Sequence, residues 1–245
     1  MHRNKEQQIL AIDIGNSQVK IGYNGSYWAT TPDNFANSLI KLNLEVNYVL
    51  ALISSVNSSN YTLVETALNL QKIKFKLVDD LLSKQILINL SRISNSGQDR
   101  ILGIFGALTK AKQPLLVVDC GTAMTLNYLD SDLTFLGGAI LPGLYTQFDS
   151  LNSKTDKIKV ATINNQAKFP ASNTIDAVSS GILLNLIGAI ESAIKLIDEE
   201  NLTVVITGGY SEIIYDLINK EKKFVILENY LVCKGIFYLE EKQRN

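Results

Sequence analysis

Residues Ile9–Tyr23 read ILAIDIGNSQVKIGY and carry the strongest structural signal in the chain. It opens with an apolar, β-branched run, Ile9–Ile12, and continues into the turn-forming residues Asp13-Ile14-Gly15-Asn16. An extended pattern resumes over Gln18–Tyr23. Such runs on either side of turn residues predict a β-hairpin with an aspartate and a glycine at its turn.

The same arrangement recurs 106 positions later (119 minus 13). There the strand Leu115–Val118 leads into Asp119-Cys120-Gly121-Thr122, and Met124–Tyr128 follows as the second strand. Two such units predict an internally duplicated chain with two homologous halves that face each other. We place the boundary near Lys112 to Pro114, which gives domains of residues 1–112 and 113–245.

Strands and helices alternate between these hairpins and after them, which predicts an α/β fold. The expected strands are Val46–Ile53, Ile73–Val78, Thr203–Ile206 and Phe224–Leu227, and the expected helices are Asn60–Leu70, Gln98–Lys110, Asn173–Glu200 with Asn173 as its cap, Ser211–Asn219 and a terminal helix.

Composition excludes several classes of function. The chain has 245 residues with 23 basic and 24 acidic side chains and a net charge of -1, so it lacks the positive field that binds nucleic acid. We predict no transmembrane segment and no signal peptide, and therefore a cytoplasmic protein.

Cys120 and Cys233 lack the spacing of a zinc or redox pair, so both are predicted to be buried thiols. The only histidine is His2, so acid-base chemistry falls to carboxylates.

Three motifs carry the chemistry. In the first, a glycine turn lets the backbone approach an anion, amides and hydroxyls can cradle phosphate, and a carboxylate can hold hydrated Mg²⁺. Its residues are Asp13, Ile14, Gly15, Asn16, Ser17, Gln18, Val19 and Lys20. The second motif is Asp119-Cys120-Gly121-Thr122, and the third is Thr207-Gly208-Gly209, where small residues leave room for an adenosine. Alone, each is also explained as an ordinary turn.

The three motifs, in this order along the chain, resemble those of the superfamily of actin, heat-shock ATPases and sugar kinases. The resemblance implies two duplicated ribonuclease H-like domains with an active-site cleft between them. It becomes more specific at Ser96-Gly97-Gln98-Asp99-Arg100, which resembles the Gly-x-Asp-Arg signature of type III pantothenate kinases. Gly137–Gly143 and Ser172-Asn173-Thr174, with Ala177 and Gly181, match further blocks of that family.

The resemblance implies a role for each site residue. By this resemblance Asp99 is the proton acceptor, and the residues that contact pantothenate are Gly97, Gln98, Asp99, Arg100 and Thr174. ATP is bound by residues 13–20 and Thr122. Asp13 holds Mg²⁺, and Asp119 holds a monovalent cation, K⁺ or NH₄⁺. It also implies a homodimer, for which the apolar face of Ile182–Ile197 is the expected contact.

Some positions depart from the family pattern. Leu90 or a neighbour stands where family members carry a pocket tyrosine, Met124 replaces a common threonine, and Thr155–Ile158 reads TDKI instead of Thr-Ala-Lys-Leu. Two alternatives therefore stay open: a non-catalytic regulatory or accessory relative, and a kinase for another small alcohol. A surface Asp-Arg pair at a helix start also explains Asp99 and Arg100. The intact Asp99 and Arg100 favour the enzyme.

Overall fold

The computed structural model describes residues 7–218 and 224–244. His2 and Asn219, the predicted last residue of one helix, lie outside these ranges. The described residues form two compact units. The first unit comprises residues 7–89, 93–110 and 230–244, and the second comprises residues 90–92, 111–218 and 224–229.

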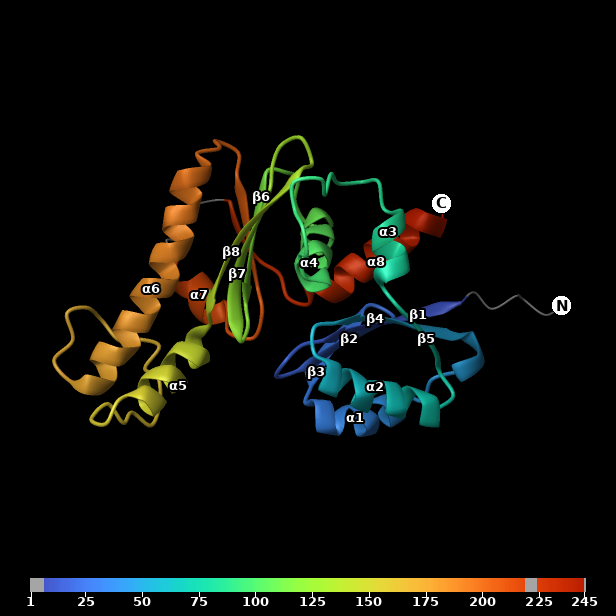
Figure 1. Cartoon of the computed structure of the whole chain (residues 1–245), viewed down its shortest axis with the longest axis horizontal. Coiled ribbons are helices and arrows are strands. Elements are labelled where there is room, and N and C mark those ends of the chain that lie inside the picture. Colours follow the sequence, from blue (N-terminus) through green and yellow to red (C-terminus); the bar gives the residue numbers. More distant parts are fainter. Residues whose placement is uncertain (1–6, 219–223, 245) are drawn as a thin grey trace. The chain divides into compact units, whose positions relative to one another are not determined.

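The first unit is built on a five-stranded sheet with the order β3-β2-β1-β4-β5 (Figure 1). Its strands are β1 (Gln8–Ile14), β2 (Val19–Tyr23), β3 (Ser26–Thr30), β4 (Val49–Ser55) and β5 (Lys74–Leu77). The first three form an antiparallel meander, which includes the predicted hairpin, and β4 and β5 are added in parallel to β1.

The second unit repeats this topology. Its strands are β6 (Leu115–Cys120), β7 (Ala123–Leu129), β8 (Phe135–Pro142), β9 (Thr203–Thr207) and β10 (Val225–Leu227), in the order β10-β9-β6-β7-β8. Strands β6, β7 and β8 pair antiparallel, and β9 and β10 are parallel to β6. Strand for strand, this is the arrangement of the first sheet, so the predicted duplication is confirmed.

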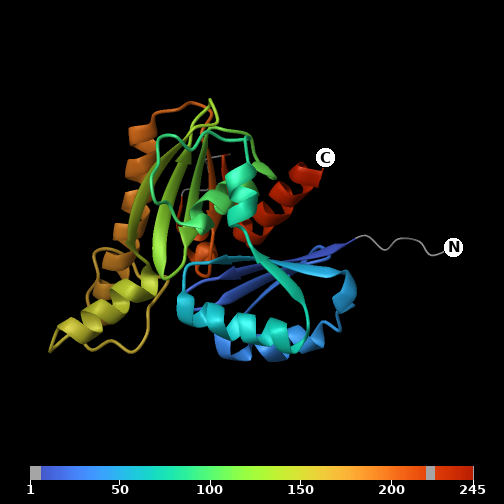
Figure 2. The ribbon, with the colours of Figure 1, turned by 45° about the vertical axis from the view of Figure 1, so that its right-hand side comes forward.

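Helices cover both faces of the first sheet (Figure 2). Helices α1 (Phe35–Lys41) and α2 (Ser58–Leu70) lie on one face, where Phe35, Leu39 and Leu68 complete a core with the strand residues. On the other face, α8 (Leu231–Arg244) packs along β1 and β2, with α4 (Gln98–Leu108) and α3 (Asp79–Lys84) beside it. Short 3₁₀ turns precede α1 and β4, at Pro32–Asn34 and Val46–Tyr48.

The C-terminal helix α8 belongs to the first unit, whereas the sequence-based division at residue 112 grouped it with the second half. The reason is its contact with α4, where two glycines let the backbones touch. A Cβ added to Gly106 would lie 2.1 Å from the carbonyl oxygen of Leu231, and one added to Gly235 would lie 2.0 Å from that of Leu102. Only residues without a side chain allow this approach.

In the second unit, the long helix α6 (Thr174–Ile197) packs with α5 (Leu144–Lys154) and α7 (Ser211–Leu217) around the second core. Asn173 caps α6 as predicted, because its side-chain oxygen accepts from the amide of Asp176 at 2.9 Å. By length and composition alone, α6 could cross a membrane, against the prediction of no such segment. This is weak evidence, because Ile182, Leu186 and Ile190 are buried in the unit's own core, as in the core helix of a soluble protein.

The burial of α6 also concerns the predicted dimer contact, the apolar face of Ile182–Ile197. Most of the apolar residues between Ile182 and Ile197 pack within the second unit. The large apolar side chains of this stretch that stay exposed are Leu184, at 53% of its surface, and Leu196, at 85%. The length of α6 is thus explained without a partner.

Candidate active site

The first loop is a tight turn between β1 and β2. Asp13 is 5% exposed, and its Oδ2 lies 3.5 Å from Nζ of Lys20, the residue opposite it on β2. The amide of Gly15 donates to the carbonyl of Gln18 at 3.0 Å, and a Cβ on Gly15 would lie 3.2 Å from the same oxygen. Asn16, Ser17 and Gln18 are exposed at the tip. The loop therefore combines a neutralised carboxylate with accessible backbone.

The Gly-x-Asp-Arg motif forms the start of α4, with Gly97 as its N-cap. Asp99 Oδ1 accepts from the amide of Arg100 at 2.9 Å, and a Cβ on Gly97 would lie only 2.4 Å from that oxygen. Glycine is therefore needed at position 97 for Asp99 to take this rotamer. Burial lowers the pKa of Arg100 and the charge of Asp99 raises it, but a guanidinium stays ionised at neutral pH. A carboxylate and a permanent cation thus stand side by side.

The second loop follows β6, and its carboxylate is held differently. Asp119 lies beside Thr207 of β9 in the parallel register. Its Oδ1 is buried and has no hydrogen-bond partner among residues 7–218 and 224–244. Gly208, at φ +101°, passes so close that a Cβ would lie 2.5 Å from this oxygen. The second and third motifs therefore meet at Asp119.

The Pro-Gly segment before α5 closes against the same loop. The carbonyl of Thr122 accepts from the amide of Gly143 at 2.9 Å and from the hydroxyl of Thr146 at 2.6 Å. A Cβ on Gly143 would lie 2.1 Å from the carbonyl oxygen of Gly121 and 2.8 Å from the hydroxyl of Tyr210. Three segments that are distant in sequence thus form one surface, on which the Thr122 side chain is exposed.

The two cysteines are buried and free, as predicted. Burial raises the pKa of Cys120, with a smaller contribution from Asp119, and burial likewise raises that of Cys233. Burial also raises the pKa of the Tyr210 phenol. Cys120 and Tyr210, beside the second loop, are therefore protonated at neutral pH, and so is Cys233 in the first unit.

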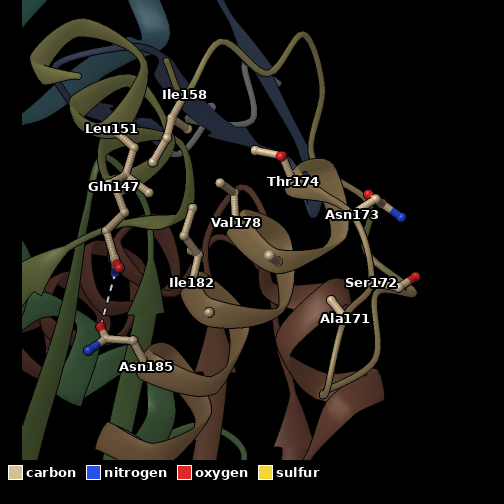
Figure 3. Close-up of a pocket in the computed structure, with 12 residues that line it drawn as sticks. Gln147, Leu151, Ile158, Ala171, Ser172, Asn173, Thr174, Val178, Ile182 and Asn185 are labelled. Carbon is tan, nitrogen blue, oxygen red and sulfur yellow. Dashed lines mark hydrogen bonds between the residues drawn. The ribbon is translucent and has the colours of Figure 1, made fainter. Parts of the chain in front are cut away.

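Thr174 is exposed at the first turn of α6 and lines a groove between α5 and α6 (Figure 3). The groove has a volume of about 750 Å³. Leu151, Ile158 and Val178 give it apolar walls, and at one end Gln147 donates to Asn185 at 3.2 Å and to the carbonyl of Pro142 at 2.8 Å. Gln147 and Asn185 were not predicted as site residues, because a single amide on a helix carries no sequence signal.

The predicted site residues are divided between the units. The first unit holds residues 13–20 and Gly97–Arg100, and the second holds Asp119, Thr122 and Thr174. Within the second unit, the structure brings Asp119 and Thr122 together with the third motif, while Thr174 lines the groove along the neighbouring α5.

The donors present fit the two cations that the sequence implied. The described residues contain no group of three or more His, Cys, Asp or Glu side chains that could hold a metal. Mg²⁺ needs none, since it is commonly bound through one carboxylate together with substrate phosphates and water, and Asp13 can supply that carboxylate. A large monovalent cation fits the buried Oδ1 of Asp119, because that oxygen lacks a donor.

Two sheets of the same topology, each with an Asp-x-Gly loop after its first strand, define a protein of the duplicated α/β class. In agreement, the chain is similar in structure to a Campylobacter jejuni protein described as a conserved Baf family transcriptional activator, with a TM-score of 0.65 and 21% identity over 96% of this chain and 99% of that one. It is also similar to a 2-dehydro-3-deoxygalactonokinase protein from Sinorhizobium meliloti, with a TM-score of 0.54 and 11% identity over 96% of each chain. At these identities the likeness concerns the fold.

Within that class the chain belongs to the type III pantothenate kinase family, which matches residues 9–196. A type III pantothenate kinase from Sulfurihydrogenibium sp. is 30% identical over 95% of this chain and 99% of the relative. One from Finegoldia magna is 26% identical over 98% of this chain and 99% of the relative. The family resemblance drawn from the motifs is confirmed.

Proposed function

We propose that the protein phosphorylates pantothenate with ATP at its primary hydroxyl, giving 4'-phosphopantothenate, the first step of coenzyme A biosynthesis. The observation that carries this proposal is membership of the type III pantothenate kinase family over residues 9–196, with relatives matched over nearly their whole length.

Asp99 is the proposed proton acceptor. Phosphoryl transfer passes through a loose transition state, in which positioning and charge neutralisation matter most, and a carboxylate in hydrogen-bond reach takes the alcohol proton late. Asp99 needs no histidine for this, and the Arg100 cation beside it favours the ionised carboxylate. Arg100 also suits the substrate carboxylate, and Gly97, Gln98 and Thr174 complete the proposed substrate contacts.

The two loops are the proposed nucleotide site. ATP supplies the phosphoryl group when bound. Residues 13–20 and Thr122 would hold its phosphates, and Asp13 would hold the accompanying Mg²⁺. The buried Oδ1 of Asp119 supports a monovalent cation, K⁺ or NH₄⁺, at the second loop, because a bare carboxylate there would repel the triphosphate.

We also infer a cytoplasmic homodimer that binds neither nucleic acid nor membrane. The balanced charge, -1 in total, supports the exclusion of nucleic acid. For the dimer, the support is the family membership together with Leu184 and Leu196, which leave apolar surface on α6. Light scattering that reports a single species of 27.1 kDa at working concentration would rule the dimer out.

One experiment separates this function from the two alternatives. Purified protein with ATP, Mg²⁺, K⁺ and pantothenate should produce ADP and phosphopantothenate in equal amounts. Turnover of another small alcohol but not of pantothenate would replace the substrate. ATP binding without turnover of any alcohol would identify a regulatory or accessory relative.

A further inference from the structure

Two asparagines at the start of α2 contact the first loop, although they lie more than 40 positions away in sequence. The Asn60 side-chain amide donates to the carbonyl oxygens of Gly15, at 2.8 Å, and Asn16, at 3.1 Å. The Asn57 amide donates to Oδ1 of Asn16 at 2.9 Å. Both asparagines are half-buried, and all of these residues belong to the first unit.

The geometry around Asn57 makes the contact rigid. Its side-chain oxygen caps α2 by accepting from the amide of Asn60 at 2.9 Å, so the nitrogen of the same group points to the loop. The backbone N–H of Asn57 in turn donates to the hydroxyl of Ser55 at 3.3 Å. Asn60 is fixed at the first turn of a 13-residue helix, which limits its freedom to follow a moving loop.

The contact has a consequence for the backbone of the loop. The described residues contain cis peptides only at Gln113–Pro114 and Phe169–Pro170, so the peptides that follow Gly15 and Asn16 are trans. In a planar trans peptide the C=O and N–H point in opposite directions. Because Asn60 draws two successive carbonyls toward α2, the N–H groups of Asn16 and Ser17 point away from α2.

We propose that Asn60, with Asn57, is a positioning residue for nucleotide use: it holds two consecutive loop amides toward the phosphates. Successive amides that point the same way form a concavity that binds anions. Asn suits the task because its NH₂ group has two donors, one for each carbonyl. This inference rests on the proposed function of the loop as a phosphate site, and it assigns Asn57 and Asn60 to that site.

The test compares Asn60→Ala with Asn69→Ala, which removes an exposed asparagine from the same helix. Loop order is measured in the nucleotide-free protein by hydrogen exchange over residues 14–20, and nucleotide use by the KM for ATP. Asn60→Ala should exchange faster in this segment and raise the KM for ATP about tenfold, with kcat and the KM for pantothenate within about twofold. Asn69→Ala should match the parent protein in every measurement.

A second variant, Asn57→Asp, keeps the oxygen that caps α2 but loses the donor to Asn16. It should leave thermal stability near that of the parent and still speed exchange in the loop, which a capping role alone would not do. Unchanged exchange in both variants overturns the inference and leaves the kinase proposal intact. Faster exchange with unchanged ATP kinetics overturns the link to nucleotide and counts against the loop as a phosphate site.

Discussion

Replacing Gly208 with alanine should destabilise the second unit far more than the same change at the adjacent Gly209. Gly208 has φ +101°, a region that costs an L-residue about 1–2 kcal/mol. The added Cβ would also lie 2.5 Å from Asp119 Oδ1 and from the backbone N and O of Cys120. All three atoms belong to the central strand β6, and the two backbone atoms cannot move cheaply, which adds about 1–3 kcal/mol.

The expected loss is therefore about 2–5 kcal/mol, or a fall in Tm of roughly 5–15 °C. A Cβ on Gly209 would have no atom within 4 Å, and its φ is not among the positive values, so Gly209→Ala should be neutral or stabilising by up to about 1 kcal/mol. Calorimetric unfolding of the two variants and the parent measures the difference. Gly208→Asn separates the two costs, because asparagine tolerates positive φ better but keeps the clash. Equal Tm values for Gly208→Ala and Gly209→Ala would contradict the predicted strain and clash at position 208.

Three further predictions concern the site. Asp99→Asn keeps the shape but cannot accept a proton, so turnover should fall by about 10² to 10⁴ with nearly unchanged ATP binding; near-native turnover at saturating substrate would remove Asp99 from its role. Asp13→Ala should weaken Mg-ATP binding more than pantothenate binding in calorimetry, and equal losses for both ligands would indicate a structural residue. Because burial raises the pKa of both thiols, Cys120 and Cys233 should resist a thiol reagent in the native protein and react in denaturant; rapid native labelling would contradict this.

The fold was predictable where local patterns were strong. The apolar runs at Ile9 and Leu115, each followed by Asp-x-Gly, predicted both hairpins and hence the duplication. Weaker elements were missed. Strand β8 contains Gly137 and Gly138, both at positive φ, and a Cβ on Gly138 would lie 1.7 Å from the carbonyl of Leu126. Such a strand lacks the alternation of apolar and polar residues that predicts a strand. At Gly138 its backbone lies so close to β7 that no side chain fits.

Other features depend on contacts that no local pattern carries. The packing of α8 in the first unit requires Gly106 and Gly235 to meet residues more than 100 positions away. The loop contacts of Asn57 and Asn60 were not predicted either, although Asn57, following a buried strand, is a recognisable helix cap. A cap motif predicts where a helix begins. Which group the side-chain nitrogen of the capping Asn57 contacts depends on the tertiary fold.

The duplication itself supports a last prediction about the monovalent cation. Asp13 faces Lys20 across the first hairpin, whereas Asp119, in the equivalent position of the second sheet, faces Thr125. One half thus neutralises its aspartate with an internal ammonium, and the other leaves a buried carboxylate oxygen without a partner in the described chain. Residues directly opposite on paired strands present their side chains on the same face. A lysine at position 125 should therefore reach Asp119 as Lys20 reaches Asp13.

In the parent protein, replacing K⁺ by Na⁺ at constant ionic strength should lower activity, because the smaller ion fits a site for a large cation poorly. In Thr125→Lys the tethered ammonium occupies the place of the ion, so the ratio of activities in K⁺ and Na⁺ should fall toward one. Thr125→Met is the matched control, since it adds a similar length without charge and should remain dependent on K⁺. A Thr125→Lys protein that still prefers K⁺, or that is inactive in both salts while folded, would contradict the equivalence of the two loops. Equal activity of the parent in K⁺ and Na⁺ would remove the cation from Asp119 altogether.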